Sequence, residues 1–544
     1  MAQKKKSRSS SGAERSSRPA RAAAKPSFSL PLWLLGRETW FVAAVCLLVA
    51  VKIFFYSASL PFFNNVDEEA HFDLIWKYAE GQWPEKGADI TDAEALDFIV
   101  VYSSPEFKRR AQQYPGGVYP PPLWTMPPEV RRARIDQVRQ RDIRNYEVYS
   151  PPLYYLLAGG WLGLGRSLGL QGAGLLYWTR FLNIAALVVL VWLAWLAGRR
   201  FFPDDQTIRL GLPLAILFLP QDVFHTLNND VFSPVLSGAA FYFLGRIVME
   251  PRGRWTLFPW AGLFTAGALL VKLSNLPLLG TMIVAWFLAL RSQGRWAISP
   301  GLIGRLSLGS LAAAVPLGAW FWRNYVHLGD LTGSQHKIEF LGWTLKPMSE
   351  LFSHPIFSLS GVSYFVHHLI ASFWRGEVVW ALERFSRPAA DYFYSISSLI
   401  LLTVSAAGWL SSLKAEAQSI NAPEKEINNR TSTHGPMILS LVTVGAAILY
   451  LATLSQVFDF NKCVYPSRAF PYFVSGRLIL CALIPFFILY LDGWRRLTGR
   501  FLPRISPLTL FMIMGLVLMV ADFIIRFPII ASEYNFWHVP LGAL

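Results

Sequence analysis

The sequence predicts an all-α membrane protein that crosses the bilayer about eleven times. Of its 544 residues, 53% are hydrophobic and only 16% are charged, and the mean hydropathy is +0.35. That composition is typical of a membrane protein rather than of several soluble domains. Apolar runs of spanning length lie near residues 38–60, 176–198, 209–224, 231–248, 255–273, 276–290, 302–322, 391–411, 436–455, 476–493 and 505–525.

The chain begins with a basic segment that differs from the rest. Residues 1–26 carry eight Lys and Arg against Glu14 alone, so they supply +7 of the net charge of +15. We therefore expect residues 1–37 to form a disordered tail at the cytoplasmic leaflet that acts as a topology signal. Because the excess charge lies in this tail and in loops, the basic balance does not indicate nucleic-acid binding.

A twelfth run, from Pro151 to Leu168, is interrupted by glycine and proline, and the loop charges decide whether it crosses. If it does not cross, the arginine-bearing loops after the second, fourth, sixth and tenth spans lie in the cytoplasm, as the positive-inside rule requires. If it crosses, all of them lie outside. We therefore expect this run to form an interfacial helix on the outer surface, where its aromatic residues are favourable.

This topology divides the chain into a membrane domain and its outside segments. It predicts a transmembrane domain over residues 38–525, with the N-terminus in the cytoplasm and an outside tail over 526–544. Two large outside loops cover residues 61–175, which hold the interfacial helices, and residues 323–390. The protein is then a multi-pass protein of the plasma (inner) membrane.

The candidate chemistry begins in an acidic cluster directly after the first span. Asp67 and Glu68 are followed by His71, and the i, i+4 spacing places Asp67 and His71 on one helix face. Such groups can transfer protons or bind substrate. The acids could instead favour the N-terminus of a helix, with Asn64 or Asn65 as its cap.

Two further acids share the membrane depth of Asp67. Glu147 precedes the interfacial helix, and Asn229 with Asp230 lies in a short outside turn between the third and fourth spans. Burying an isolated carboxylate near hydrocarbon costs several kcal/mol or more. We therefore expect Asp67, Glu147 and Asp230 to meet water, a cation or a substrate, although Asp230 could also be a helix N-cap.

Basic residues lie on the same side of the predicted membrane. They are Lys272, Arg323, Arg375 and Arg477. Each alone could simply reach lipid headgroups. Together they could hold a phosphate, to which arginine offers two parallel hydrogen bonds.

The order of these motifs resembles a bacterial membrane family of unknown function that is related to the GT-C glycosyltransferases. More distantly, the chain is similar to the lipid A aminoarabinose transferases and the protein O-mannosyltransferases. The resemblance implies a GT-C-like fold whose first outside loop packs interfacial helices over a cavity. The motifs that carry it are Asp67-Glu68-Glu69-Ala70-His71, Pro151-Pro152-Leu153-Tyr154-Tyr155, Asn228-Asn229-Asp230, Lys272-Leu273-Ser274, Arg323-Asn324-Tyr325 and Gly476-Arg477.

The resemblance also implies roles for individual residues. Asp67 matches the catalytic acid position of the first loop, and Glu147 matches an acid that in some relatives helps to bind a metal or the substrate. Lys272 and Arg477 match positions that face the carrier phosphate. Glu69 departs from the pattern, because proline is expected there.

The catalytic candidates are therefore Asp67, Glu68, Glu147 and Asp230. The candidates for binding substrate or carrier phosphate are His71, Asn229, Lys272, Arg323, Arg375 and Arg477. A divalent metal is possible, with Glu68, His71 and Glu147 as candidate ligands, but the sequence does not identify a cofactor.

We accordingly expect an integral membrane glycosyltransferase that moves a sugar from a polyprenyl-phosphate-linked donor to an acceptor on the non-cytoplasmic face. Its partners are the lipid bilayer and the carrier-linked sugar. One alternative is a transporter or lipid-handling protein, which predicts polar residues deep within several spans; Lys52 is the main such charge that the sequence indicates. Another is a non-catalytic partner in envelope polysaccharide assembly, which keeps the fold but gives the acids no catalytic role.

Overall fold

The computed structural model describes residues 32–292, 299–418, 424–461, 463 and 465–538. Most of the expected basic tail, and the end of the expected outside tail, lie outside these residues. The chain divides into a unit over residues 1–40 and a larger unit over residues 41–544. The helices described below belong to the larger unit, apart from the beginning of the first helix.

Nine helices of the described part of the chain are long and apolar enough to cross a membrane. Two further apolar helices, α7 (Gln206–Phe218) and α9 (Leu257–Val271), are shorter. All eleven expected runs therefore form helices, which confirms the all-α, multi-spanning class, and nine of them have spanning length. The long helices are α1 (Leu32–Ser59), α6 (Gly172–Phe201), α8 (Ser233–Met249), α10 (Pro277–Arg291), α11 (Pro300–Leu328), α14 (Pro388–Gln418), α15 (Glu424–Val457), α16 (Leu483–Phe501) and α17 (Pro507–Ile530).

Shorter helices fill the two loops that were expected outside. The first loop holds α2 (Glu68–Ala79), α3 (Ala93–Tyr102), α4 (Pro128–Arg139) and α5 (Leu153–Ser167). The run expected to be interfacial is α5, and it is not among the candidate spans of the described residues. The second loop holds α12 (Gln335–Phe340) and α13 (Leu359–Arg375).

Single 3-10 turns and very short strands complete the fold. Strand β1 (Thr344–Leu345) pairs antiparallel with β4 (Phe458–Asp459), and β2 (Val379–Trp380) pairs antiparallel with β3 (Glu383–Arg384). The 3-10 turns are η1 (Ala111–Gln113), η2 (Pro115–Gly117), η3 (Leu123–Thr125), η4 (Asp222–His225), η5 (Asn229–Val231), η6 (Leu273–Asn275), η7 (Met348–Ser353), η8 (Pro355–Phe357), η9 (Gly476–Ala482) and η10 (Phe536–His538).

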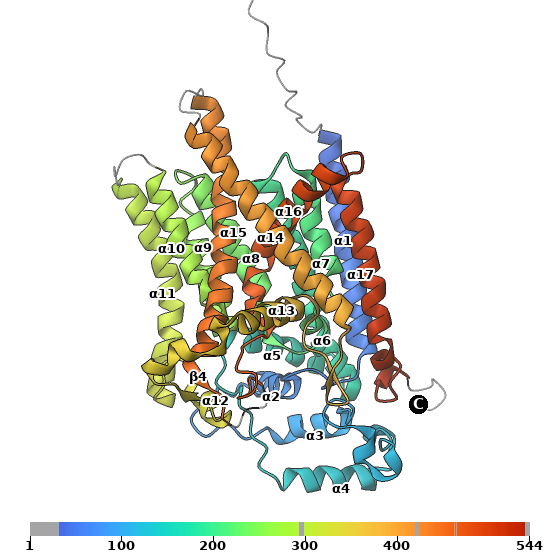
Figure 1. The fold of residues 1–544 in the computed structure, drawn as a ribbon. Coiled ribbons are helices and arrows are strands. Elements are labelled where there is room, and N and C mark those ends of the chain that lie inside the picture. The colour runs from blue at the N-terminus through green and yellow to red at the C-terminus, as the bar shows by residue number, and fades with distance from the viewer. Residues whose placement is uncertain (1–31, 293–298, 419–423, 462, 464, 539–544) are drawn as a thin grey trace, which may run out of the picture. The chain divides into compact units, whose positions relative to one another are not determined.

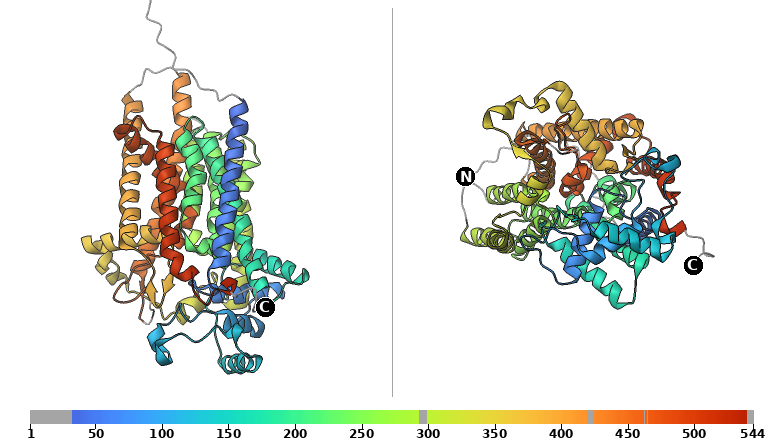
Figure 2. Two further views of the ribbon diagram at one scale, coloured as in Figure 1. Left: turned by 90° about the vertical axis from the view of Figure 1, so that its right-hand side faces the viewer. Right: turned by 90° about the horizontal axis from the view of Figure 1, so that it is seen from below.

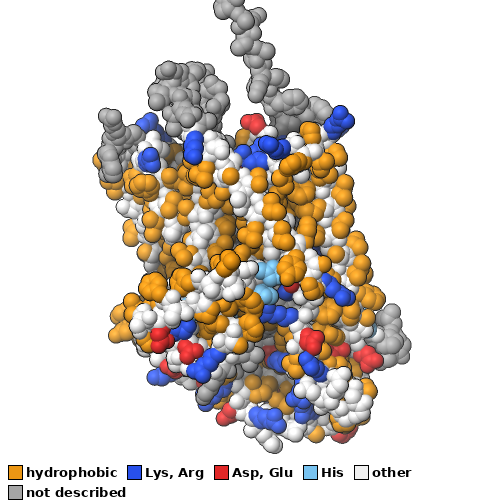
Figure 3. Space-filling model, viewed as in Figure 1, with side chains coloured by type: hydrophobic (Ala, Val, Ile, Leu, Met, Phe, Trp, Pro, Cys, Tyr) orange, Lys and Arg blue, Asp and Glu red, His pale blue; other side chains and the backbone are white. Residues whose placement is uncertain are grey.

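The long helices run side by side, and both loops gather at one end of the bundle (Figures 1 and 2). Figure 3 shows apolar side chains along the flank of the bundle and charged side chains at its two ends. This distribution is the one expected for helices that cross a bilayer, because hydrocarbon excludes charge.

The first loop is fixed to the end of the bundle by a compact apolar cluster of its own. Phe72 of α2 and Tyr155 of α5 are both fully buried in it. The two helices approach closely at Gly159, where an added Cβ would lie 3.0 Å from the Ala79 nitrogen and 3.1 Å from the Ile75 oxygen. Glycine therefore permits the close packing of the last turn of α2 against α5.

Candidate functional site

Arg477, at the beginning of η9, lies at the centre of three carboxylates from distant segments. Its Nη2 is 2.6 Å from Asp67 Oδ2, its Nη1 is 3.3 Å from Asp230 Oδ2, and its Nε is 3.2 Å from Glu377 Oε2. All four side chains are at most 15% exposed. We call these residues, with the groups that adjoin them, the Arg477 cluster.

Further pairs extend the Arg477 cluster. Asp230 Oδ1 lies 2.7 Å from Lys272 Nζ. Glu147 forms an ion pair with Lys337 of α12, and the Ser150 hydroxyl donates to Glu147 Oε2 at 2.6 Å. Two loops and three turns between spans thus meet at one buried, charged site.

The backbone at Asp67 presents its side chain to this site. Asp67 precedes α2 with φ of 67°, in the left-handed region that aspartate adopts more readily than most residues. It makes no side-chain cap of the helix. Its Oδ1 instead accepts a hydrogen bond from the Tyr146 hydroxyl, and its Oδ2 accepts one from Arg477. Helix capping therefore does not account for this carboxylate.

Asp230 is likewise not a helix cap. Asn228 occupies the N-cap of η5, and its Oδ1 accepts from the Asp230 backbone N–H at 2.9 Å. The Asp230 carboxylate, which is fully buried, is left to contact Lys272 and Arg477.

Two acids of the cluster are held ionised. Burial alone would raise the pKa of Asp67, but the charges of Arg477 and then Lys337 outweigh it and hold that pKa well below its usual range. Burial also acts to raise the pKa of Glu147, and Lys337 outweighs it, which lowers the pKa to about 2. Both carboxylates are therefore anions at neutral pH.

His71 and Asn229 form the uncharged edge of the cluster. His71 Nδ1 lies 2.8 Å from the Tyr155 hydroxyl, while His71 Nε2 and Asn229 Oδ1 are buried without a hydrogen-bond partner among the described residues. Burial lowers the pKa of His71 to about 4; the charges of Glu147 and Asp67 oppose this shift, and those of Lys272 and Arg477 add to it. A buried polar atom without a partner is rare in proteins, so this edge offers a neutral imidazole and an amide oxygen to a bound group.

The structure does not bring every predicted site residue to the Arg477 cluster. Glu68 follows Asp67 in sequence but points elsewhere, and its two oxygens pair with the fully buried Arg180 at 2.9 Å each. Arg323 donates to the Pro84 carbonyl. These contacts fix the first loop to α6 and α11.

Arg375 and Glu69 also have partners outside the Arg477 cluster. Arg375 pairs with Asp391 through two hydrogen bonds of 2.6 and 3.0 Å. Glu69, for which the sequence offered no partner, lies 2.5 Å from Lys108 at a partly exposed position.

Three members of the cluster were missed from the sequence. Tyr146 directly precedes the predicted Glu147, and this position next to a site residue was the signal that could have identified it. Lys337 and Glu377 lie in the second outside loop, and only their shared side of the membrane connected them with the acids of the first loop.

The residues present do not fit the metal site that the sequence left possible. The described part of the chain contains no group of three or more His, Cys, Asp and Glu side chains placed to hold a metal ion. Of the candidate ligands, Glu68 is paired with Arg180 and Glu147 with Lys337. We therefore assign no step to a metal.

A second polar network lies between α1, α17 and η4, inside the bundle. Arg526 Nε donates to Asp522 Oδ1 at 2.7 Å, and the Tyr56 hydroxyl donates to Asp522 Oδ2 at 3.0 Å. Arg526 Nη1 lies 3.2 Å from His225 Nε2. We call this the Arg526 network.

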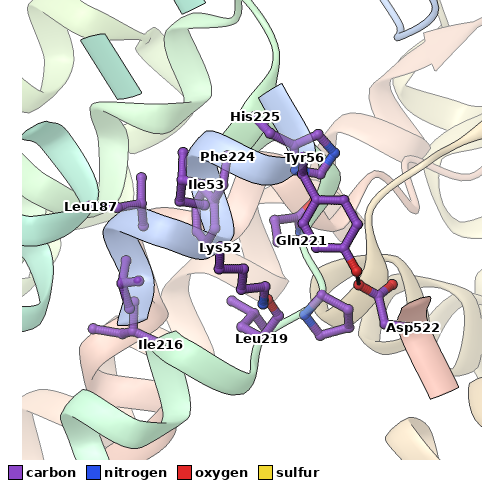
Figure 4. Close-up of a pocket in the computed structure, with 12 residues that line it drawn as sticks. Lys52, Ile53, Tyr56, Leu187, Ile216, Leu219, Gln221, Phe224, His225 and Asp522 are labelled. Atoms are coloured by element: carbon purple, nitrogen blue, oxygen red, sulfur yellow. Dashed lines mark hydrogen bonds between the residues drawn. The ribbon is translucent and has the colours of Figure 1, made fainter. Parts of the chain in front are cut away.

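Lys52 extends the Arg526 network away from the loops. Its Nζ donates to the carbonyls of Leu217 and Leu219 at 2.8 Å each, where α7 ends. Figure 4 shows Lys52, Tyr56 and Asp522 lining one hollow. The sequence interpretation, with Lys52 as the main charge deep in a span, was incomplete. It did not consider Asp522, which lies within the expected run 505–525, and it ended that run before Arg526, whereas α17 continues to Ile530.

Comparison with known proteins connects the middle of the chain with one family. The family model of the dolichyl-phosphate-mannose-protein mannosyltransferases matches residues 170–320, which extend from α6 into α11. This match confirms the relation to protein mannosyltransferases that was expected from the sequence. It includes Asp230 and Lys272 but neither Asp67 nor Arg477. No curated protein matches the sequence.

Solved structures with a similar course of the chain are distant. ArnT from Cupriavidus metallidurans in the apo state is 13% identical, with 93% of this chain and 75% of that chain covered and a TM-score of 0.44. The same protein bound to undecaprenyl phosphate is 14% identical, with 92% and 74% covered and a TM-score of 0.41. The Archaeoglobus fulgidus oligosaccharyltransferase with Zn and sulfate is 10% identical, with 90% and 53% covered and a TM-score of 0.38. At such TM-scores these likenesses add no weight to a functional assignment.

Proposed function

We propose that this chain, related over residues 170–320 to the dolichyl-phosphate-mannose-protein mannosyltransferases, is a membrane glycosyltransferase. It moves a sugar from a polyprenyl-phosphate-linked donor to an acceptor on the non-cytoplasmic face. The observation that carries this proposal is the Arg477 cluster, which joins an ionised acid, Asp67, to cations that suit a phosphate. The cluster lies where both loops gather at one end of the bundle.

The donor phosphate would bind between Arg477 and Lys272. Arginine can form two parallel hydrogen bonds to a phosphate, and lysine adds a point charge. Each cation is now paired with carboxylates carried by loops and turns, and the phosphate would replace some of these contacts. Lys337, which pairs with Glu147, is a third cation at the same site.

This exchange would also activate Asp67. The Arg477 charge is the largest influence that lowers the Asp67 pKa, whereas burial acts to raise it. When a phosphate takes over Arg477, the pKa of Asp67 rises and the carboxylate becomes a better base. Donor binding would thus switch on the base only when substrate is present.

In the transfer step, Asp67 accepts the proton of the acceptor hydroxyl. The hydroxyl oxygen forms a bond to the anomeric carbon, and the bond from that carbon to the phosphate oxygen breaks with its electron pair passing to the phosphate. The configuration at the anomeric carbon is inverted. Arg477, Lys272 and Lys337 stabilise the negative charge that develops on the departing phosphate.

The decisive test replaces Asp67 by Asn in the purified, reconstituted protein. Asp67→Asn removes the base but preserves the shape, so transfer should fall by about 10² to 10⁴ while carrier binding is retained. The matched control is Glu69→Gln, because Glu69 lies two residues away and pairs with partly exposed Lys108; it should keep nearly full activity. Full transfer by Asp67→Asn with unaltered carrier binding would refute the role of Asp67.

The Arg526 network supports a second candidate function, that of a transporter or lipid-handling protein. This alternative predicted polar residues deep within several spans, and Lys52, Asp522 and Arg526 are polar groups within α1 and α17. Translocation of a carrier lipid across vesicles by the Asp67→Asn variant at the wild-type rate would favour it. Transfer by the purified chain alone would exclude a purely non-catalytic role in envelope polysaccharide assembly.

A further inference from the structure

Three arginines line a hollow between the beginning of α14 and the last turns of α17, apart from the Arg477 cluster. They are Arg375 at the end of α13, Arg387 directly before α14, and Arg526 of α17. Two carboxylates, Asp391 and Asp522, pair with Arg375 and Arg526. The group therefore carries one positive charge in excess.

The arginines still have hydrogen-bond donors to offer. Arg375 uses three of its five N–H groups, two toward Asp391 and one toward the Gly376 carbonyl. Arg387 is exposed, and its side chain makes no hydrogen bond or ion pair with the described residues. Arg526 is held by Asp522 and His225, and it also donates to the Arg375 carbonyl at 3.3 Å, so it forms a fixed wall.

The surroundings of the hollow are those of a lipid rather than of a soluble anion. Figure 1 shows the first turns of α14 and the last turns of α17 at the same end of the bundle. Ile524 and Phe527 on α17 are 64% and 54% exposed, and Tyr392 and Ile396 on α14 are 57% and 53% exposed. Apolar side chains that face outward from two spans beside an arginine group offer contacts both to hydrocarbon chains and to a charged head.

From this arrangement we infer that the hollow binds the phosphate of an anionic membrane lipid, with the lipid chains lying against α14 and α17. Arg387 and the free N–H groups of Arg375 would bind the phosphate oxygens. The site is separate from the one proposed for the sugar donor, and its occupation does not depend on transferase activity.

The lipid site is connected to the Arg477 cluster by a short piece of chain. Arg375 is two residues before Glu377, whose carboxylate contacts Arg477. The Glu377 backbone N–H also donates to Asp222 Oδ2 at 2.9 Å. A lipid bound to Arg375 would therefore steady the segment that places Glu377.

The test measures lipid binding without any transfer reaction. Delipidated protein in detergent is titrated with phosphatidylglycerol, phosphatidylcholine or inorganic phosphate, and the unfolding midpoint and the retained lipid by native mass spectrometry are recorded. Phosphatidylglycerol should raise the midpoint and be retained, whereas the other two should do so much less. The affinity of Arg387→Gln for phosphatidylglycerol should be about tenfold lower than that of the wild type, since the variant loses a charged double hydrogen bond.

Arg132→Gln on α4 is the matched control, because Arg132 is also exposed and makes no ion pair among the described residues. It should bind phosphatidylglycerol as the wild type does. Without lipid, Arg387→Gln should unfold at the wild-type midpoint, because its side chain has no partner to lose. Equal phosphatidylglycerol affinity of Arg387→Gln and wild type would overturn the inference, as would equal protection by phosphatidylcholine or by inorganic phosphate.

Discussion

The Arg477 cluster and the Arg526 network each contain a buried arginine, but they hold it in different ways. Arg526 is held by Asp522 one turn away on its own helix, by His225, and by backbone carbonyls. Arg477 is held by three carboxylates from separate loops and turns. The partners of Arg526 include backbone carbonyls, which move only with the chain itself, whereas the carboxylate partners of Arg477 are side chains that can rotate away one at a time.

This difference indicates which arginine can exchange partners with a ligand. A guanidinium that is held by its own helix and by fixed carbonyls stabilises the fold. A guanidinium held mainly by carboxylate side chains of separate segments, with one contact to the Ser475 hydroxyl, can exchange a carboxylate for a phosphate, whose oxygens offer the same sign of charge and a similar geometry. We therefore infer that Arg526 stabilises the fold and that Arg477 binds a ligand.

The largest expected effect tests the structural half of the comparison. Arg526→Met leaves Asp522 buried without its cation, so the free energy of unfolding should fall by about 3–5 kcal/mol. The transfer activity of the remaining folded protein should change little. Denaturant unfolding in detergent, together with activity per folded molecule, measures both quantities. An unchanged stability would break the comparison.

The next effect concerns pH and the neutral edge of the Arg477 cluster. The folded pKa of His71, about 4, lies below its ordinary value of about 6.5, so between these values the unfolded chain binds more protons. The contribution of neutral His71 to the free energy of unfolding is thus complete above about pH 6.5 and is lost as the pH falls toward 4. In total this contribution is on the order of 3 kcal/mol. Unfolding midpoints of wild type and His71→Gln between pH 7.5 and 4.5 should show that the variant loses this part of the slope. The same slope in both proteins would contradict the assignment.

The smallest effect tests the ligand-binding half. Arg477→Lys keeps the charge but loses the planar set of N–H groups that can form two parallel hydrogen bonds. Sugar transfer from the donor should therefore fall by about 10- to 100-fold with little loss of stability. Steady-state kinetics with a polyprenyl-phosphate-linked sugar, and thermal unfolding as the control, measure the two effects. If Arg477→Lys unfolds readily but transfers normally when folded, the two arginines do not differ in role.

The sequence by itself determined the class of the protein and the side on which its charged groups gather. Eleven apolar runs are local properties of the chain, and all eleven form helices. The loop charges placed Asp67, Asp230, Lys272 and Arg477 on one predicted side of the membrane, and the structure joins these four in one cluster. The expected orientation in the membrane stays a prediction.

Only the tertiary structure decided which acid meets which cation. Asp67 and Arg477 are 410 positions apart, while Glu68, the neighbour of Asp67, pairs with Arg180 instead. Arg323 and Arg375, on the expected side of the membrane, have partners elsewhere, and Asp522 with Arg526 forms a network that the sequence interpretation overlooked. The physical reason is that an ion pair requires two groups within a few ångströms and with matching directions, and consecutive residues point to different faces. Apolar length and loop charge can be read locally, but direction is set by how helices rotate and pack.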